Sequence, residues 1–195
     1  MKIAEIKKYL YEIRFYILFS SLVFISGVLT GYFFVHDFPE ETREIMEELK
    51  EFFASGEKMT DFQIFLFILE NNITKLFAVL LLGIFAGIIP LFTSFANGMI
   101  LGIFGCLVSE NLLWSFFFVG ILPHGIIEIP VLILSTAVGM KIGKVALWRL
   151  FGGEIRIKKE LVKAIKFYII VLMPLLILAA AIEAFITTIL LDMVS

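Results

Sequence analysis

The sequence predicts an all-α fold: a polytopic membrane helix bundle of about five transmembrane helices, forming a single domain of residues 1–195. Two observations lead to this prediction. The chain is 61% hydrophobic and 17% charged, whereas ordinary soluble domains are about 45–50% apolar and about 25% charged. Several uncharged runs also reach the length of about 20 mostly apolar residues that one membrane crossing requires. A soluble fold of this length could not bury so much apolar surface.

The first span is expected at Phe15–Val35, an uncharged run that follows a charged stretch of 14 residues. The run is longer than the apolar core of a signal peptide, and no small-residue cleavage site follows it. We therefore expect this segment to be retained as a membrane span.

Residues 37–72 form an acidic segment that we expect to lie outside the membrane. Its first half places apolar residues at helical spacing up to Gly56, namely Ile45, Met46, Leu49, Phe52 and Phe53. A capping box at Thr60–Gln63 then starts a second helix, Phe62–Leu69, which is too short to span. Together they predict an external amphipathic helical hairpin. It either covers the bundle or offers a docking surface to an extracytoplasmic partner.

The second and third spans are expected within Leu76–Ser109, an uncharged run. As one helix it would be about 51 Å long, which exceeds the hydrocarbon core of about 30 Å, so it must fold back. Polar and helix-breaking residues predict the break near its middle, at Pro90, Thr93, Ser94, Asn97 and Gly98. The two arms are then Leu76–Phe92 and Asn97–Ser109.

The fourth span, Leu112–Met140, is expected to be a broken helix because it contains Pro123, Gly125 and Pro130. The fifth span is expected at Phe167–Leu191.

Basic residues orient these spans. Twelve of the sixteen Lys and Arg residues lie in the first 14 residues or in the loop 141–166. Because basic flanks stay on the cytoplasmic side, we expect a cytoplasmic N-terminus, a cytoplasmic basic loop at 141–166 and an external C-terminus in a multi-pass protein of the cell membrane.

Small residues four apart recur in each span. Such pairs let helix backbones approach closely in lipid, which favours a compact bundle or a tight homo-oligomer. The pairs are Gly27/Gly31, Gly83/Gly87, Gly98/Gly102, Gly139/Gly143 and Ala180/Ala184.

Three ionisable residues, His124, Glu128 and Glu183, fall inside the predicted spans, where such groups are costly. Asn97 opens the predicted third span. Three interpretations remain open. The four side chains satisfy one another and the broken backbone, or the carboxylates relay protons or bind a cation in a transporter, or His124, Glu128 and Glu183 hold a catalytic zinc.

Other function classes find little support. The net charge of −2 and the absence of a basic stripe argue against nucleic acid as a partner. No P-loop, dinucleotide fingerprint or HExxH motif is present, so we expect no cofactor and no resident metal. A single cysteine, Cys106, excludes an intramolecular disulfide. Asn and Gln number only five while Glu and Lys dominate the charges, a balance typical of thermophilic proteins.

Several short blocks resemble the stage II sporulation protein M family over roughly residues 60–190. They are Leu122–Pro130 (LPHGIIEIP), Ala137–Gly143 (AVGMKIG), Asn71–Asn72, Phe95–Gly98 (FANG) and Ile182–Phe185 (IEAF). The resemblance implies a multi-span membrane protein. The member that gives the family its name anchors or recruits two cell-wall-degrading partners and is not regarded as a hydrolase. The shared His, Glu and Asn positions imply a common polar core.

The sequence as a whole therefore predicts a non-enzymatic membrane scaffold or assembly subunit of the cell envelope, which binds membrane or extracytoplasmic protein partners. The alternative is a small proton- or cation-coupled transporter or channel that uses Glu128 and Glu183. A more remote alternative is an intramembrane metal-dependent hydrolase.

Overall fold

The computed structural model describes residues 1–44, 47, 60–110, 122–153 and 157–187, and within these ranges the chain forms helices joined by short turns, with no strand. Five helical segments are long and apolar enough to cross a membrane. This confirms the predicted all-α bundle with five candidate spans. Most of the apolar helix predicted around residues 45–53, and its end at Gly56, lie outside the described residues. Residues 112–121 of the predicted fourth span lie outside them too.

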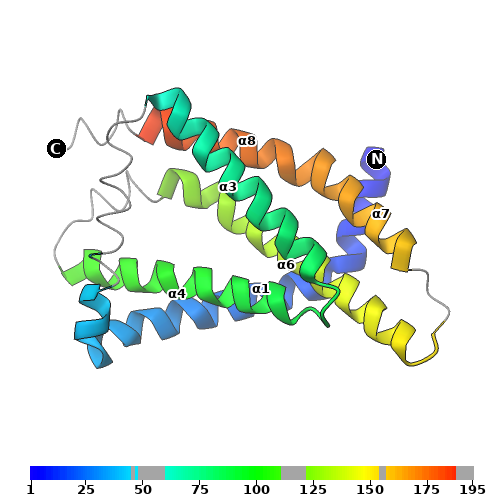
Figure 1. Cartoon of the computed structure of the whole chain (residues 1–195), viewed down its shortest axis with the longest axis horizontal. Coiled ribbons are helices and arrows are strands. Elements are labelled where there is room, and N and C mark those ends of the chain that lie inside the picture. Colours follow the sequence, from blue (N-terminus) through cyan, green and yellow to red (C-terminus); the bar gives the residue numbers. More distant parts are fainter. Residues whose placement is uncertain (45–46, 48–59, 111–121, 154–156, 188–195) are drawn as a thin grey trace.

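The first span is α1, Ile3–Asp37, which is continuous through the charged start of the chain. It packs mainly against α4, Ile88–Glu110, and the two run alongside each other in Figure 1. Glycines allow this close approach. A Cβ at Gly27 or Gly31 would overlap a backbone carbonyl oxygen of α4, and a Cβ at Gly98 or Gly102 would overlap one of α1.

The second span differs from the prediction, because α3, Asp61–Leu82, is a single helix. The short external helix Phe62–Leu69 and the start of the second span are therefore one element, and residues 61–72 belong to a candidate span. The capping box is confirmed: Gln63 N donates to Thr60 Oγ1 at 3.4 Å, and Thr60 N donates to Gln63 Oε1 at 2.9 Å. Two charged residues within this segment, Glu70 and Lys75, are exposed and do not end the helix.

The turn after α3 comes earlier than predicted. Ala86 and Gly87 have positive φ angles of 56° and 74° and reverse the chain between Leu82 and Ile88. Pro90 is the third residue of α4, in the first turn, where a missing N–H costs no hydrogen bond. The break expected around Pro90 to Gly98 is thereby corrected, because this proline marks the start of a helix.

The fourth span contains α6, Leu122–Leu150, which runs through Gly125 and Pro130 without interruption. The sequence predicts a helix break at Pro123, Gly125 and Pro130. This prediction is wrong for the described residues, because the helix is continuous there. Pro123 is the second residue of the helix, where no intrahelical N–H bond is needed, and an interior proline is tolerated in membrane helices. The helix also continues past Met140, so much of the predicted basic loop is helical.

The last span is built from four consecutive pieces: α7 (Ile157–Phe167), η2 (Tyr168–Leu172), α8 (Met173–Ile182) and η3 (Glu183–Thr187). The two η segments are π-helical. Pro174 explains the first of them. Its ring would crowd the carbonyl one turn earlier in an α-helix, and the wider turn lets Met173 N donate to Tyr168 O instead.

A second set of glycines joins α3 and its turn to α6. A Cβ at Gly83 would overlap the backbone of Gly139, and one at Gly143 would overlap the backbone of Ala86 and Gly87. Gly87 also needs its positive φ. All eight glycines of the predicted packing pairs thus lie at helix contacts within one chain, so a homo-oligomer would need other residues for its interface.

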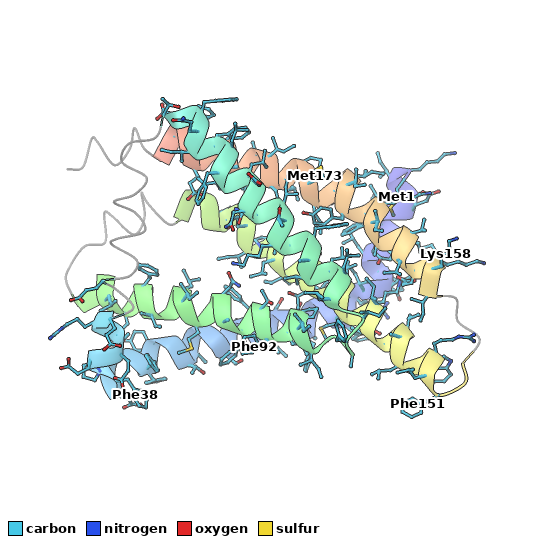
Figure 2. The ribbon with its side chains drawn as sticks, viewed as in Figure 1. Met1, Phe38, Phe92, Phe151, Lys158 and Met173 are labelled. Carbon is cyan, nitrogen blue, oxygen red and sulfur yellow. The ribbon has the colours of Figure 1, made fainter. Side chains whose placement is uncertain are left out.

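The two ends of the bundle differ in charge. The start of α1 lies beside α7, while η3, where the described part of the last span ends, lies at the other end (Figure 1). Figure 2 likewise places Met1 and Lys158 near one end and Phe38 at the other. The basic stretches therefore share one end, as the predicted orientation requires, and the membrane side of that end stays a prediction.

Serine hydroxyls link the helices inside the bundle. Ser94 Oγ on α4 donates to Ser20 O on α1 at 3.4 Å, and Ser20 Oγ donates to Ile133 O on α6 at 3.2 Å. Ser135 Oγ on α6 donates to Leu76 O on α3 at 2.8 Å. Large apolar side chains such as Phe92 (71% exposed) and Phe15 (67%) cover the outside, which is the arrangement expected of a lipid-facing surface.

Candidate functional site

The intramembrane polar site begins with a hydrogen bond from the side-chain amide of Asn72 on α3 to the carboxylate of Glu128 on α6. The two helices run in the same direction, and the sequence separation between contacting residues stays nearly constant along them. The contacting pairs are Asn72 with Glu128, Leu76 with Ser135 and Gly83 with Gly139. Both polar side chains are half-buried. The glycine contact at one end and the serine contact in the middle therefore position the amide opposite the carboxylate.

This hydrogen bond lies deep in the bundle. Asn72 is near the middle of the 22-residue α3, about 16 Å from either end at about 1.5 Å per residue. In a bilayer with a hydrocarbon core of about 30 Å, that is close to the midplane. Lipid offers a carboxylate no hydrogen bond there, so a donor from the neighbouring helix stabilises Glu128.

A second polar contact joins α3 to α4 one turn further along. Lys75 Nζ donates to Asn97 Oδ1 at 3.1 Å, and Asn97 Nδ2 donates to Thr93 O at 2.7 Å. Asn97 lies inside α4, which corrects its expected place at the start of the third span. Asn72 and Lys75 are three residues apart and therefore neighbours on the surface of α3, from which Asn72 bonds to α6 and Lys75 bonds to α4.

Glu183 is the first residue of the π-helical segment η3 and is half-buried. This segment packs against α3, where the rings of Phe65 and Phe185 lie 5.9 Å apart. The side chain of His124 lies outside the described part of the chain, so its expected pairing with Glu128 stays a prediction. Of the four polar residues expected to cluster, the structure describes three, on three different helices: Asn97 on α4, Glu128 on α6 and Glu183 on η3.

The last span holds one more polar connection to α3. Tyr168, the first residue of η2, donates its hydroxyl to Ile73 O at 2.6 Å, and its ring lies 5.1 Å from that of Phe77. Tyr168 is 1% exposed. α3 is therefore the element that receives the polar side chains of both α6 and the last span.

The basic end of the molecule carries a separate group of interacting side chains, the basic-end cluster: Tyr9, Glu12, Lys141 and Glu160. Lys141 Nζ lies 2.7 Å from Glu12 Oε2 and 2.9 Å from Glu160 Oε1. Tyr9 donates its hydroxyl to Glu160 Oε1 at 3.2 Å, and the Lys141 ammonium lies 4.4 Å from the centre of the Tyr9 ring. The cluster ties α1, α6 and α7 together.

Sequence reasoning missed the basic-end cluster and Lys75. In the sequence, Glu12 and Lys141 belong to two separate charged segments. They are 129 residues apart, and only the fold brings them together. Asn72 was noted only within the family resemblance. The signal available was the polar run at residues 70–75 (ENNITK) between two apolar stretches.

Within residues 1–44, 47, 60–110, 122–153 and 157–187, no group of three or more His, Cys, Asp or Glu side chains is arranged to hold a metal ion. At the far end of α1, His36 Nε2 lies 3.7 Å from Cys106 Sγ on α4. This pair joins the outer ends of two helices that already pack tightly.

The sequence of the chain matches the model of one known protein family. The model of the family described as stage II sporulation protein M matches residues 20–188. The chain belongs to the stage II sporulation protein M family. The match begins within the first of the five helical segments, reaches the other four, and includes Asn72, Asn97, Glu128 and Glu183. Comparison with curated proteins and comparison with solved structures each gave no match.

Membership of the stage II sporulation protein M family, together with five candidate spans, identifies the chain as a multi-pass membrane protein. The family is not known as a family of enzymes. The resemblance noted for residues 60–190 is thereby confirmed, and the family match extends it into the first span.

Proposed function

We propose that this protein is a non-enzymatic membrane scaffold, or assembly subunit, that anchors or recruits partner proteins at the membrane. The hydrogen bond between Asn72 and Glu128 is the observation that carries the proposal. The Glu128 carboxylate lies near the middle of the membrane and accepts a hydrogen bond from the neighbouring helix, so it connects two helices within the bundle. Lys75–Asn97 and Tyr168–Ile73 repeat the same pattern on the same helix.

The backbone packing supports a rigid role. Glycines hold α1 against α4 and α3 against α6 at backbone contact, and the basic-end cluster fixes α7 to both α1 and α6. Large relative movements of these helices would break several of these contacts at once. A rigid bundle suits a protein that presents a surface to a partner.

The acidic end offers a surface for that partner. The carboxylate residues described there are all exposed: Asp37, Glu40, Glu41, Glu44, Glu47 and Asp61. Around Phe38 the chain leaves the regular α1 geometry, and Thr42 Oγ1 donates back to Phe38 O at 2.8 Å. We propose that a partner with a basic surface docks at this end, which the predicted orientation places outside the cell.

Site-specific photo-crosslinking in the native cell tests this function. A photoreactive amino acid at Glu40 is expected to crosslink to one specific partner protein. The matched control places the same amino acid at Lys159, an exposed position at the opposite end. No specific adduct at Glu40, together with recovery of the protein alone in a mild detergent, would contradict the scaffold function.

Transport is the second candidate, and the π-helical segment at Glu183 favours it. Such segments recur at functional sites, and an acidic residue inside a span can carry a proton. Purified protein in liposomes would then dissipate an imposed proton gradient, and Glu183→Gln would abolish the flux. Liposomes with wild-type protein that hold the gradient as long as protein-free liposomes would eliminate this candidate.

A further inference from the structure

A pocket of about 320 Å³ opens at the basic end between the start of α1 and α7. Three lysines line it, Lys8 from α1 and Lys163 and Lys166 from α7, and Tyr9 and Glu12 form part of its wall. Both Tyr9 and Glu12 belong to the basic-end cluster, so the wall is held in place by buried contacts.

The charges around the pocket favour an anion. Glu12 is paired with Lys141 at 2.7 Å and is 4.0 Å from Lys163. The side chains of the pocket lining and the basic-end cluster include four lysines and three glutamates, an excess of one positive side-chain charge. The glutamates are Glu5, Glu12 and Glu160, and the lysines are Lys8, Lys141, Lys163 and Lys166. A phosphodiester, with its single negative charge, would balance this excess.

The pocket lies at the level of lipid headgroups. α1 has 35 residues, about 52 Å at 1.5 Å per residue, so its ends extend beyond a hydrocarbon core of about 30 Å. Arg14 stacks on Tyr11 and Phe15, with its guanidinium carbon 3.7 Å and 4.5 Å from the ring centres. Aromatic and basic residues of this kind mark the membrane interface, and the pocket lies just beyond them along α1.

Exposed apolar side chains continue from the pocket towards the membrane interior. Ile169 and Ile170, 51% and 41% exposed, lie within the next turn after Lys166, which is exposed as they are. On α1, Tyr11 follows Lys8 in the same way and is 66% exposed. A phosphate held by the lysines would place acyl chains against these residues, which a free phosphate would not use.

We propose that the pocket between α1 and α7 binds the phosphate of an anionic membrane phospholipid, held by Lys8, Lys163 and Lys166. The site is independent of the proposed scaffold function. It would fix the basic end of the bundle at the surface of an anionic leaflet.

Native mass spectrometry of the detergent-purified full chain tests the site, with phosphatidylglycerol, phosphatidylcholine and inorganic phosphate added at equal concentrations. Phosphatidylglycerol is expected to bind in a one-to-one complex and to compete out phosphatidylcholine. The variant Lys8→Gln/Lys163→Gln/Lys166→Gln should lose about a hundredfold in apparent affinity, because each basic residue near an anionic surface contributes about fivefold.

The control variant Lys7→Gln/Lys158→Gln/Lys159→Gln removes the same charge at exposed positions outside the pocket. It should retain phosphatidylglycerol binding within about twofold. Equal losses in the two variants would mean non-specific charge attraction and overturn the site. Equal binding of phosphatidylcholine, or competition by inorganic phosphate alone, would overturn an anionic lipid as the ligand. If the triple variant does not fold, Lys166→Gln against Lys159→Gln gives the same comparison.

Discussion

The side-chain amide of Asn72 on α3 hydrogen-bonds the carboxylate of Glu128 on α6 near the middle of the bilayer. In water such a bond would add little, because both groups would be hydrated equally well when separated. In lipid the separated groups have no such solvent. The pair therefore selects the register in which α3 and α6 pack.

A double-mutant cycle measures this pair. Asn72→Leu and Glu128→Leu each remove this hydrogen bond and should lower the free energy of unfolding by about 1–3 kcal/mol. The double variant should lose less than the sum, with a coupling of about 0.6–1.7 kcal/mol. Unfolding in detergent micelles by increasing denaturing detergent gives these values. Additive losses would mean that the two side chains do not interact.

The glycine contact between α1 and α4 can be tested at two glycines of one helix. A Cβ at Gly98 would overlap Phe24 O, whereas nothing lies within 4 Å of a Cβ at Gly105. Gly98→Ala should therefore destabilise the protein by about 1–3 kcal/mol. Gly105→Ala should be neutral or stabilise it by up to about 1 kcal/mol, because alanine favours helix. The same unfolding assay applies, and equal effects would contradict the close packing of these helices.

Removing Lys141 from the basic-end cluster leaves Glu12 and Glu160 close together, with Lys163 4.0 Å from Glu12. Lys141 is 13% exposed in its side chain, and Glu160 is 11% exposed. Lys141→Met should cost about 2–4 kcal/mol, somewhat below the full cost of a buried unpaired charge because Glu12 reaches water. Lys144→Met, at an exposed position three residues away, is the control and should change stability by less than about 0.5 kcal/mol. Similar unfolding curves for the two variants would rule out the cluster as a stabilising contact.

The Tyr168 hydroxyl ties the last span to α3, so Tyr168→Phe removes one hydrogen bond at nearly constant volume. The expected loss is about 0.5–1 kcal/mol, typical of such bonds within membranes. Tyr11→Phe, at an exposed position, should leave stability unchanged. The thermal unfolding midpoints of the two variants provide the comparison, and a midpoint for Tyr168→Phe equal to the wild type would contradict this bond.

The number and type of the spans were predictable because a membrane-spanning helix must be long and apolar. Runs such as Phe15–Val35 meet both conditions. Helix ends were predicted less well. Pro90 predicts a break between the second and third spans, although a proline at the third position of a helix fits the same sequence pattern. The sequence pattern predicts that Glu70 and Lys75 lie outside the second span, but single charged side chains on an exposed helix face can reach the interface or a polar neighbour.

The polar contacts were predictable as residue types but not as pairs. Glu128 stood out in the sequence because it is a carboxylate in an apolar run. Its partner Asn72 is 56 residues away, and only the register of α3 against α6 joins them. The same holds for Lys141 and Glu12, since the sequence shows both charges but not which helix ends meet.

The most direct test of the central claim, that Glu128 connects helices in a scaffold, is the amount of partner protein that copurifies with the Glu128→Gln variant from native membranes. Glutamine still presents an oxygen acceptor to Asn72 but carries no charge and cannot release a proton. The account predicts the same partner in the same yield as for the wild-type protein. Loss of the partner with glutamine, in a variant that folds normally, would show that the charge itself is needed and would contradict the account.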